Sequence, residues 1–194
     1  MKTGLLFGSF NPIHIGHIAI AGYIVEFTSI EEVWFVVSPQ NPLKEPESLI
    51  SEQHRLKMVG IATQSFAPRM KVCDIELSMP RPSYTIDTLT LLSNKFPERE
   101  FIPIIGADSL NCIDKWKYFD RILSNYSVYV YPRPDVDLDK LLSIYNVHTV
   151  NAPVLDISST FIRQSVAQQK NVDFLLPKGV YEYIKSNNLY MQTK

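Results

Sequence analysis

The feature that most constrains the fold is an alternation of short apolar runs with longer segments of helical periodicity. The runs have strand length, are rich in Val, Ile, Phe and Tyr, and cover residues 3–7, 33–37, 70–75, 101–105, 127–131 and 147–150. Apolar residues three or four apart predict helices over 16–27, 51–66, 84–95, a broken stretch 108–123, 138–144, 160–168 and 177–186. Strands that are apolar throughout form parallel sheets covered on both faces. The sequence therefore predicts a doubly wound, mostly parallel α/β fold with C-terminal helices.

The length of the chain predicts one domain over residues 1–194. Its 45% hydrophobic content is enough for a substantial core. No internal repeat or low-complexity linker divides it, and residues 38–46, with three prolines, are expected to form a surface loop. Ligands of doubly wound sheets bind beyond the carboxyl ends of the strands, so the loops that follow strands are the places to search.

Charge and cysteine content exclude several classes of protein. A formal charge of -1 provides no overall positive field, so we expect no nucleic-acid partner. Cys73 and Cys112 are far apart and in no C-x-x-C pattern, which argues against disulfides and zinc and favours the reducing cytoplasm. No run approaches the roughly 20 apolar residues of a membrane span, and the N-terminal run is too short for a signal peptide.

The loop after the first strand combines two features of a phosphate site. Gly8 ends the strand and allows close approach of a ligand, and Gly16 and His17 stand at a helix N-terminus, whose N–H groups favour anions. His14 and His17 are three residues apart, so both imidazoles can donate to the same phosphate. A lone histidine would be read as structural, but two that bracket a helix start favour phosphate binding.

A second helix start follows the last strand at residues 157–163. Ser158 and Ser159 can cap this helix and present hydroxyl and N–H donors to an anion. Arg163 lies one helical turn after Ser159 and can reach the same oxygens with its planar fork. Taken alone, this segment is better explained as an ordinary cap followed by a solvent-facing arginine.

Two further loops offer groups for a second substrate. Ser83, Tyr84 and Thr85 precede a helix and supply donors suited to a carboxylate, although a simple helix cap explains them equally well. Gly106 permits close approach after the fourth strand, and Asp108 can accept from ribose hydroxyls.

Trp116 lies at a loop-helix junction between Lys115 and Lys117. Its indole can stack on an electron-poor pyridine ring, although a tryptophan with apolar neighbours is more often part of a core.

Motifs of several common enzyme classes are missing. Neither G-x-G-x-x-G nor G-x-x-x-x-G-K-[ST] occurs, which argues against a dinucleotide redox fold and a P-loop ATPase. The absence of G-x-S-x-G removes support for a serine hydrolase.

Against this background, GSFNPIHIGH resembles the G-x-F-x-P-x-H-x-G-H signature of a nucleotidyltransferase superfamily, and ISSTFIR resembles its second signature. Class I aminoacyl-tRNA synthetases share H-x-G-H, but the chain is short for one and has no K-M-S-K-S sequence. With SYTIDTL, IIGADSL and LPKGVYEYIKSNNLY, nearly the whole chain resembles the nicotinate mononucleotide adenylyltransferases. The resemblance implies a Rossmann-like fold and adenylyl transfer from ATP to nicotinate mononucleotide, a step of NAD biosynthesis that yields deamido-NAD and pyrophosphate.

The resemblance also implies individual roles. Tyr84, Thr85 and Trp116 would hold the nicotinate, and Lys44 and Arg133 would contact phosphate. Three positions depart from the family pattern. Asn11 replaces an aspartate, Leu43 replaces a loop histidine, and Lys117 stands where an aromatic residue is frequent.

The implied reaction needs no enzyme nucleophile, so catalysis reduces to positioning and charge stabilisation. His14, His17 and Arg163 are assigned to the polyphosphate, with His17 nearest the α-phosphate. Ser9, Phe10 and Gly106 are assigned to backbone contacts with the nucleotides.

The expected cofactor is Mg²⁺, carried by ATP and water, because no carboxylate cage for a metal is visible. The alternatives left open are adenylyl transfer to nicotinamide mononucleotide or phosphopantetheine, and a non-catalytic nucleotide-binding module. The oligomeric state is open as well, a homo-oligomer included.

Overall fold

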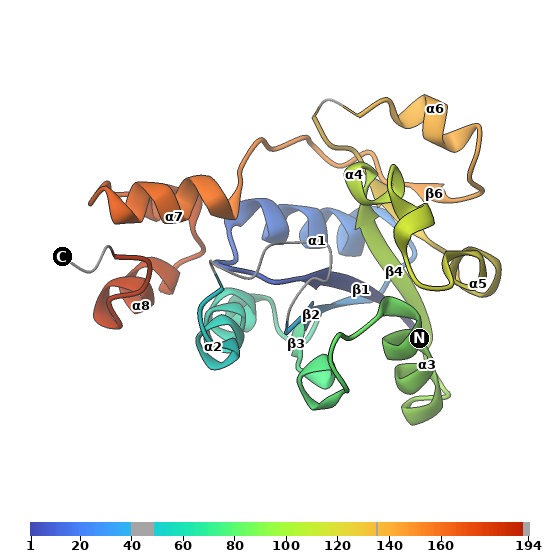
Figure 1. Cartoon of the computed structure of the whole chain (residues 1–194), viewed down its shortest axis with the longest axis horizontal. Helices are drawn as coiled ribbons and strands as arrows, with labels where there is room; N and C mark the ends of the chain where they lie inside the picture. Colours follow the sequence, from blue (N-terminus) through green and yellow to red (C-terminus); the bar gives the residue numbers. More distant parts are fainter. Residues whose placement is uncertain (40–48, 135, 192–194) are drawn as a thin grey trace.

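The structure, a computed structural model, describes residues 1–39, 49–134 and 136–191. Its centre is a six-stranded sheet in the order β3-β2-β1-β4-β5-β6, in which all neighbours are parallel (Figure 1). The strands are β1 (Lys2–Gly8), β2 (Glu32–Val37), β3 (Met70–Cys73), β4 (Glu100–Gly106), β5 (Tyr129–Tyr131) and β6 (His148–Thr149). The predicted doubly wound fold is confirmed.

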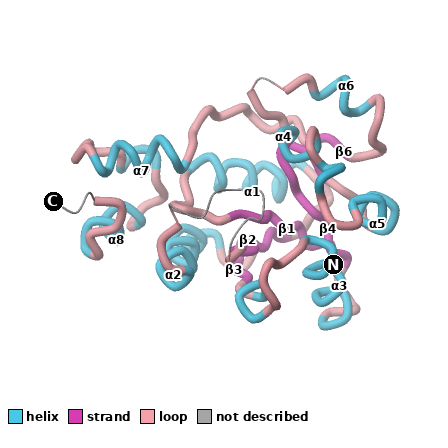
Figure 2. Tube along the Cα trace, viewed as in Figure 1, coloured by secondary structure: helices cyan, strands magenta, loops and turns pink. Residues whose placement is uncertain are grey.

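Alternate residues of the central strands enter two separate cores, which explains why these strands are apolar throughout. Leu6 and Phe35 pack in one core against α1 (Ile15–Phe27), α2 (Glu52–Thr63), α7 (Ser159–Ala167) and α8 (Val180–Ser186). Leu5 and Val36 pack in the other against α3 (Thr85–Lys95), α4 (Ala107–Leu110), α5 (Phe119–Asn125) and α6 (Leu138–Leu142). Helices therefore surround the sheet, as Figure 2 shows. None of the described helices has the length and apolar character needed to cross a bilayer.

Several predicted boundaries differ from the structure because turns interrupt the periodicity. The third strand ends at Cys73, since Asp74 begins the 3-10 helix η3 (Ile75–Ser78). The broken stretch divides into α4, the 3-10 helix η4 (Ile113–Lys115) and α5, and Tyr118 caps α5 in the left-handed region at φ 53°. The remaining 3-10 helices are η2 (Gln64–Phe66) and η5 (Asp173–Leu175).

The order of strands creates a switch point beside β1. From β1 the chain goes to β2 and β3 on one side and then crosses to β4 on the other side of β1. The loops after β1 and β4 therefore diverge from the middle of the sheet, where ligands of such folds bind.

A group of charged residues at the opposite end of the sheet, the amino-end network, joins the starts of several strands. The buried carboxylate of Glu32 accepts from the Lys71 ammonium at 2.6 Å and from the Trp34 indole at 2.8 Å, and pairs with Arg99. The Thr3 hydroxyl also donates to it, at 3.2 Å. Burial alone would raise the pKa of Glu32, but the Lys71 hydrogen bond and the charges of Arg99 and Lys71 outweigh it and hold the pKa below its ordinary value.

Candidate active site

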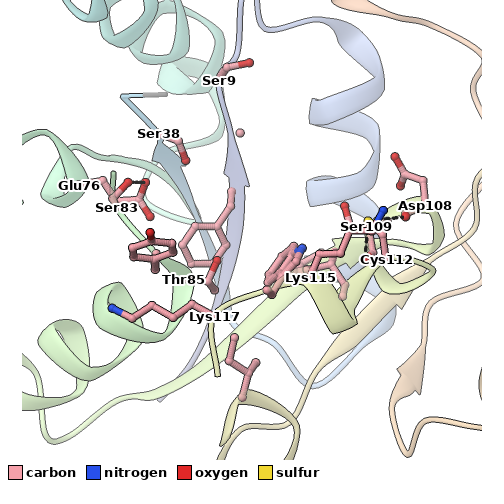
Figure 3. A pocket seen from close by; sticks show the side chains of 18 of the residues that line it. Ser9, Ser38, Glu76, Ser83, Thr85, Asp108, Ser109, Cys112, Lys115 and Lys117 are labelled. Atoms are coloured by element: carbon pink, nitrogen blue, oxygen red, sulfur yellow. Dashed lines mark hydrogen bonds between the residues drawn. The ribbon is translucent and has the colours of Figure 1, made fainter. Parts of the chain in front are cut away.

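A cavity of about 400 Å³ opens at the carboxyl ends of β1, β2 and β4. Figure 3 shows its side chains approaching from several elements. Predicted site residues among those lining it are Gly8, Ser9, Tyr84, Thr85, Gly106, Asp108 and Trp116. The switch point thus brings residues from the first, third and fourth strand loops to one space.

The two histidines of the first loop lie against each other at the N-terminus of α1. Their ring centroids are 3.8 Å apart, and the backbone N–H of His14 donates to Nδ1 of His17 at 3.2 Å. Because Nδ1 of His17 accepts this hydrogen bond, it carries no proton of its own, and the N–H group of the ring is on Nε2. Burial, followed by the charge of Arg133, lowers the pKa of His14 to about 4, so this imidazole is neutral at neutral pH.

Phe10 supports the histidines from the core. Its ring is buried and contacts His17 edge-on at 5.1 Å between centroids. Its φ of 45° lies in the left-handed region, which is uncommon for an aromatic residue and typical of functional loops. A Cβ on Gly8 would meet this ring at 2.9 Å, so Gly8 is needed for packing of Phe10 as well as for access to the cavity.

The helix start near the end of the chain lies directly on the first loop. The Ser159 hydroxyl donates to the Pro12 carbonyl at 2.8 Å, and Nη1 of Arg163 donates to the Asn11 carbonyl at 2.9 Å. The Ser158 hydroxyl caps α7 by accepting from the Phe161 N–H at 3.2 Å. Two segments at opposite ends of the chain are therefore neighbours. The hydroxyl of Ser159, expected to face an anion, is bonded to the loop instead.

The substituted position Asn11 also has a partner from the end of the chain. Its side-chain oxygen accepts from the Tyr190 hydroxyl at 2.8 Å. A neutral amide thus serves as an acceptor where the family commonly has a carboxylate.

Arg133 and Asp108 face each other above the end of β4. Nε of Arg133 lies 3.5 Å from Oδ1 of Asp108, and the guanidinium covers the Tyr131 ring at 5.1 Å. This Nε is buried and makes no hydrogen bond in the described part of the chain, and the same holds for Nδ1 of His14. A Cβ on Gly106 would come within 2.2 Å of the Asp108 carboxylate, so any other residue there would displace the Asp108 side chain. Because Nε of Arg133 still faces the Asp108 carboxylate, Nδ1 of His14 is the buried atom here that a polar ligand can complete.

The turn before α3 is organised by a glutamate that sequence reasoning did not select. Glu76 is only 3% exposed and accepts from the hydroxyls of Ser83 at 2.9 Å and Thr88 at 2.8 Å. The Ser83 hydroxyl is therefore committed to Glu76, contrary to its expected use as a ligand donor. Tyr84 caps α3 and Thr85 is its first residue, with both lining the cavity. The signal in the sequence that could have identified Glu76 was an acidic residue within an otherwise apolar 3-10 turn.

Lys117 links the Trp116 loop to α3. Its ammonium bonds Asp87 at 2.9 Å and lies 4.4 Å from the centre of the Tyr84 ring. Trp116 is half-buried and lines the cavity, so its indole is accessible rather than enclosed in the core.

A buried arginine on α2, Arg55, was also missed. It donates to the Ser9 carbonyl at 2.8 Å and to the Ser38 carbonyl at 2.7 Å. The signal was a charged residue on the buried stripe of α2, which otherwise contains Met58, Val59 and Ala62. Lys44 lies outside the described residues.

The chain as a whole is similar to known proteins of one family. A family profile described as cytidylyltransferase-like matches residues 5–165. A "Probable nicotinate-nucleotide adenylyltransferase" of Cytophaga hutchinsonii is 49% identical over 98% of this chain and 98% of its own length. One from Flavobacterium psychrophilum is 45% identical over 98% of this chain and 99% of its own.

Among solved structures, the nicotinic acid mononucleotide adenylyltransferase of Plasmodium falciparum complexed with NaAD matches with a TM-score of 0.82. It is 20% identical, with 97% of each chain covered, a likeness that shows the shared fold.

Proposed function

This chain belongs to the nicotinate-nucleotide adenylyltransferases of the cytidylyltransferase-like family, and we propose that it transfers the adenylyl group of ATP to nicotinate mononucleotide. The observation that carries the proposal is that the N-terminal turns of α1 and α7 lie together. Arg163 donates a hydrogen bond to the Asn11 carbonyl, and Ser159 donates one to the Pro12 carbonyl. His14, His17 and Arg163 are not among the residues that line the cavity, but the two helix N-termini meet at the loop after β1, whose Gly8 and Ser9 do line it. Two neighbouring helix N-termini suit a polyphosphate better than a single phosphate.

The polyphosphate half of the site uses His14, His17 and Arg163. The two imidazoles donate N–H groups toward the phosphates, with His17 nearest the α-phosphate, and the Arg163 fork adds a fixed positive charge. Further phosphate and nucleotide contacts come from Gly8, Ser9, Phe10, Lys44, Gly106, Arg133, Ser158 and Ser159, with Ser159 acting through its backbone N–H because its hydroxyl is bonded to Pro12.

The mononucleotide half uses the start of α3 and the Trp116 loop. Thr85 and the N–H groups beside Tyr84 bind the nicotinate carboxylate, because a helix N-terminus favours an anion over a neutral amide. Trp116 stacks on the pyridine ring and Asp108 accepts from ribose hydroxyls.

The reaction is an in-line displacement on the α-phosphorus of ATP. A phosphate oxygen of the mononucleotide forms the new P–O bond, the bond from the α-phosphorus to the bridging oxygen breaks, and pyrophosphate leaves with that oxygen. The histidines and Arg163 stabilise the charge that develops on the equatorial and leaving oxygens.

Mg²⁺, if bound with ATP, would supply positive charge that offsets the charge of the polyphosphate. No cluster of three His, Cys, Asp or Glu residues that could hold a metal occurs among residues 1–39, 49–134 and 136–191. This donor set fits an ion held mainly by substrate and water.

The chain works as one catalytic domain, because the proposed site draws on residues from Gly8 to Arg163 and no part of that span can be separated from it. The free thiols of Cys73 and Cys112 suit the reducing cytoplasm, where we place the reaction.

The test is to mix purified protein with ATP, Mg²⁺ and either nicotinate or nicotinamide mononucleotide, and to identify the dinucleotide by mass spectrometry. We expect deamido-NAD and pyrophosphate in equal amounts, with higher kcat/KM for the acid. Equal or higher efficiency with the amide would overturn the acid preference, and ATP binding without pyrophosphate release would indicate a binding module.

A further inference from the structure

Arg55 binds main-chain oxygens of two separate loops. It is 1% exposed, and it donates to the carbonyls of Ser9, Ser38, Pro39 and Ile50 at 2.8, 2.7, 3.0 and 3.2 Å. No carboxylate lies within ion-pair distance of it in the described part of the chain. A fully buried arginine is normally paired with an acid. Here the guanidinium instead uses its donors to fix backbone.

The loops that Arg55 joins both border the cavity. Ser9 follows β1 and Ser38 follows β2, and both line the cavity. Figure 3 shows their side chains on the same side of this space. The same guanidinium also bonds the carbonyls of Pro39 and Ile50. One side chain thus sets the spacing between two substrate loops.

The bond to Ser9 fixes the direction of the next N–H group. The Ser9–Phe10 peptide is trans, so its C=O and N–H point in opposite directions. With the carbonyl held by Arg55, the N–H of Phe10 points away from α2. The positively charged guanidinium of Arg55, bonded to the Ser9 carbonyl, also polarises the peptide and makes the Phe10 N–H a stronger donor.

We propose that Arg55 is a positioning residue for adenylyl transfer, which holds the Ser9–Phe10 peptide so that the Phe10 N–H meets the ATP phosphates. This inference rests on the proposed function, in which Ser9 and Phe10 contact the nucleotide through their backbone. In this proposal Arg55 does not contact the substrate and acts through the loop after β1. Its hydrogen bond to Ser38 keeps the loop after β2 next to the loop after β1.

The test compares Arg55→Lys and Arg55→Met with the control Val59→Ala, which removes buried volume from the same face of α2 and leaves the hydrogen bonds to the loops in place. A lysine keeps the charge but cannot bond four carbonyls. We expect the KM for ATP to rise about tenfold in Arg55→Lys, and kcat/KM for ATP to fall about a hundredfold in Arg55→Met, the scale of one lost oxyanion donor. Val59→Ala is expected to lower Tm and to leave the KM for ATP and the KM for nicotinate mononucleotide unchanged.

The KM measurement separates positioning from folding. Partial unfolding reduces the concentration of active enzyme and hence Vmax, but the molecules that remain folded keep their KM. A normal KM for ATP in both Arg55 variants would overturn the proposal, whatever their Tm. If Arg55→Met yields little folded protein, Arg55→Lys alone decides the matter.

Calorimetric titration with ATP alone distinguishes this inference from the proposed function. A wild type that binds ATP but forms no dinucleotide refutes the function, while weaker ATP binding by Arg55→Lys still supports positioning. Wild-type dinucleotide synthesis together with unchanged ATP binding by both variants refutes the positioning role and leaves the function standing.

Discussion

The two ends of the sheet use charge in opposite ways. At the amino ends of the strands, Lys71 and Arg99 converge on the buried carboxylate of Glu32, so cation and anion compensate within the protein. At the carboxyl ends, Arg55 and Arg163 donate to backbone carbonyls of loops. Buried Nδ1 of His14 makes no hydrogen bond within the described residues. Nε of Arg133, and Nε of Arg99 at the amino end, also make none there, but each lies 3.5 Å from a carboxylate.

This difference separates stabilisation from function. A buried carboxylate with its donors in place adds rigidity but has no capacity left for a ligand. Donors fixed by a scaffold and left incomplete cost stability in the free protein and are repaid when an anion binds. Changes at the amino end are therefore expected to affect unfolding, and changes at the carboxyl end to affect kinetics.

The largest effect is expected from His17→Ala. Loss of the imidazole donor at the α1 mouth should lower kcat at least about a hundredfold, measured by pyrophosphate release in a coupled assay. Glu32→Gln, at the other end of the sheet, is the control, because it is expected to leave kcat unchanged. Near-normal turnover by a folded His17→Ala protein would remove this histidine from the mechanism.

Arg163→Ala is expected to raise the KM for ATP and to lower kcat/KM roughly thirtyfold, with little change in Tm. The residue loses a charge-assisted contact to phosphate, a loss of about 2 kcal/mol in the transition state. Arg163→Lys should recover only part of the activity, since an ammonium lacks the planar fork. Unchanged ATP kinetics in the alanine variant would contradict the assignment.

Glu32→Gln should have the reverse profile, with kcat and KM unchanged and a free energy of unfolding lower by about 2–4 kcal/mol, from urea denaturation. Because the folded pKa of Glu32 lies below the ordinary 4.5, its charge stabilises the wild type above that pH. The stabilisation is lost as the pH falls through the folded pKa, and the variant should lack this part of the pH dependence. A kinetic defect at neutral pH would show that the two ends are coupled.

The smallest effect concerns His14. With a folded pKa of about 4 against 6.5 for the free side chain, the unfolded chain binds more protons between these values. Stability therefore falls as the pH drops from 6.5 toward 4. His14→Asn should reduce the stability difference between about pH 7.5 and about pH 5 by about 1–2 kcal/mol, measured by urea denaturation at both values. An equal pH dependence in both proteins would refute the buried neutral state of His14.

Sequence patterns identified the strands, helices and loops that form the site better than the hydrogen bonds between its residues. The strand and helix periods located Gly8, Gly106 and the α1 and α7 starts, because parallel strands place the loops after them at one edge. The same patterns could not show that Ser83 donates to Glu76 or that Ser159 donates to Pro12. A hydroxyl bonds whichever acceptor the fold brings within reach, and that acceptor can be far away in the sequence.

The amino-acid sequence by itself determined the layered α/β architecture, the two helix starts and the family, because these follow from local periodicity and short motifs. Only the tertiary structure decided that Arg55 serves two loops and that Tyr190 reaches Asn11. Such contacts join residues up to 179 positions apart, and they exist only after the sheet and its helices have closed. Local pattern sets which elements form, whereas the directions of buried donors are set by packing.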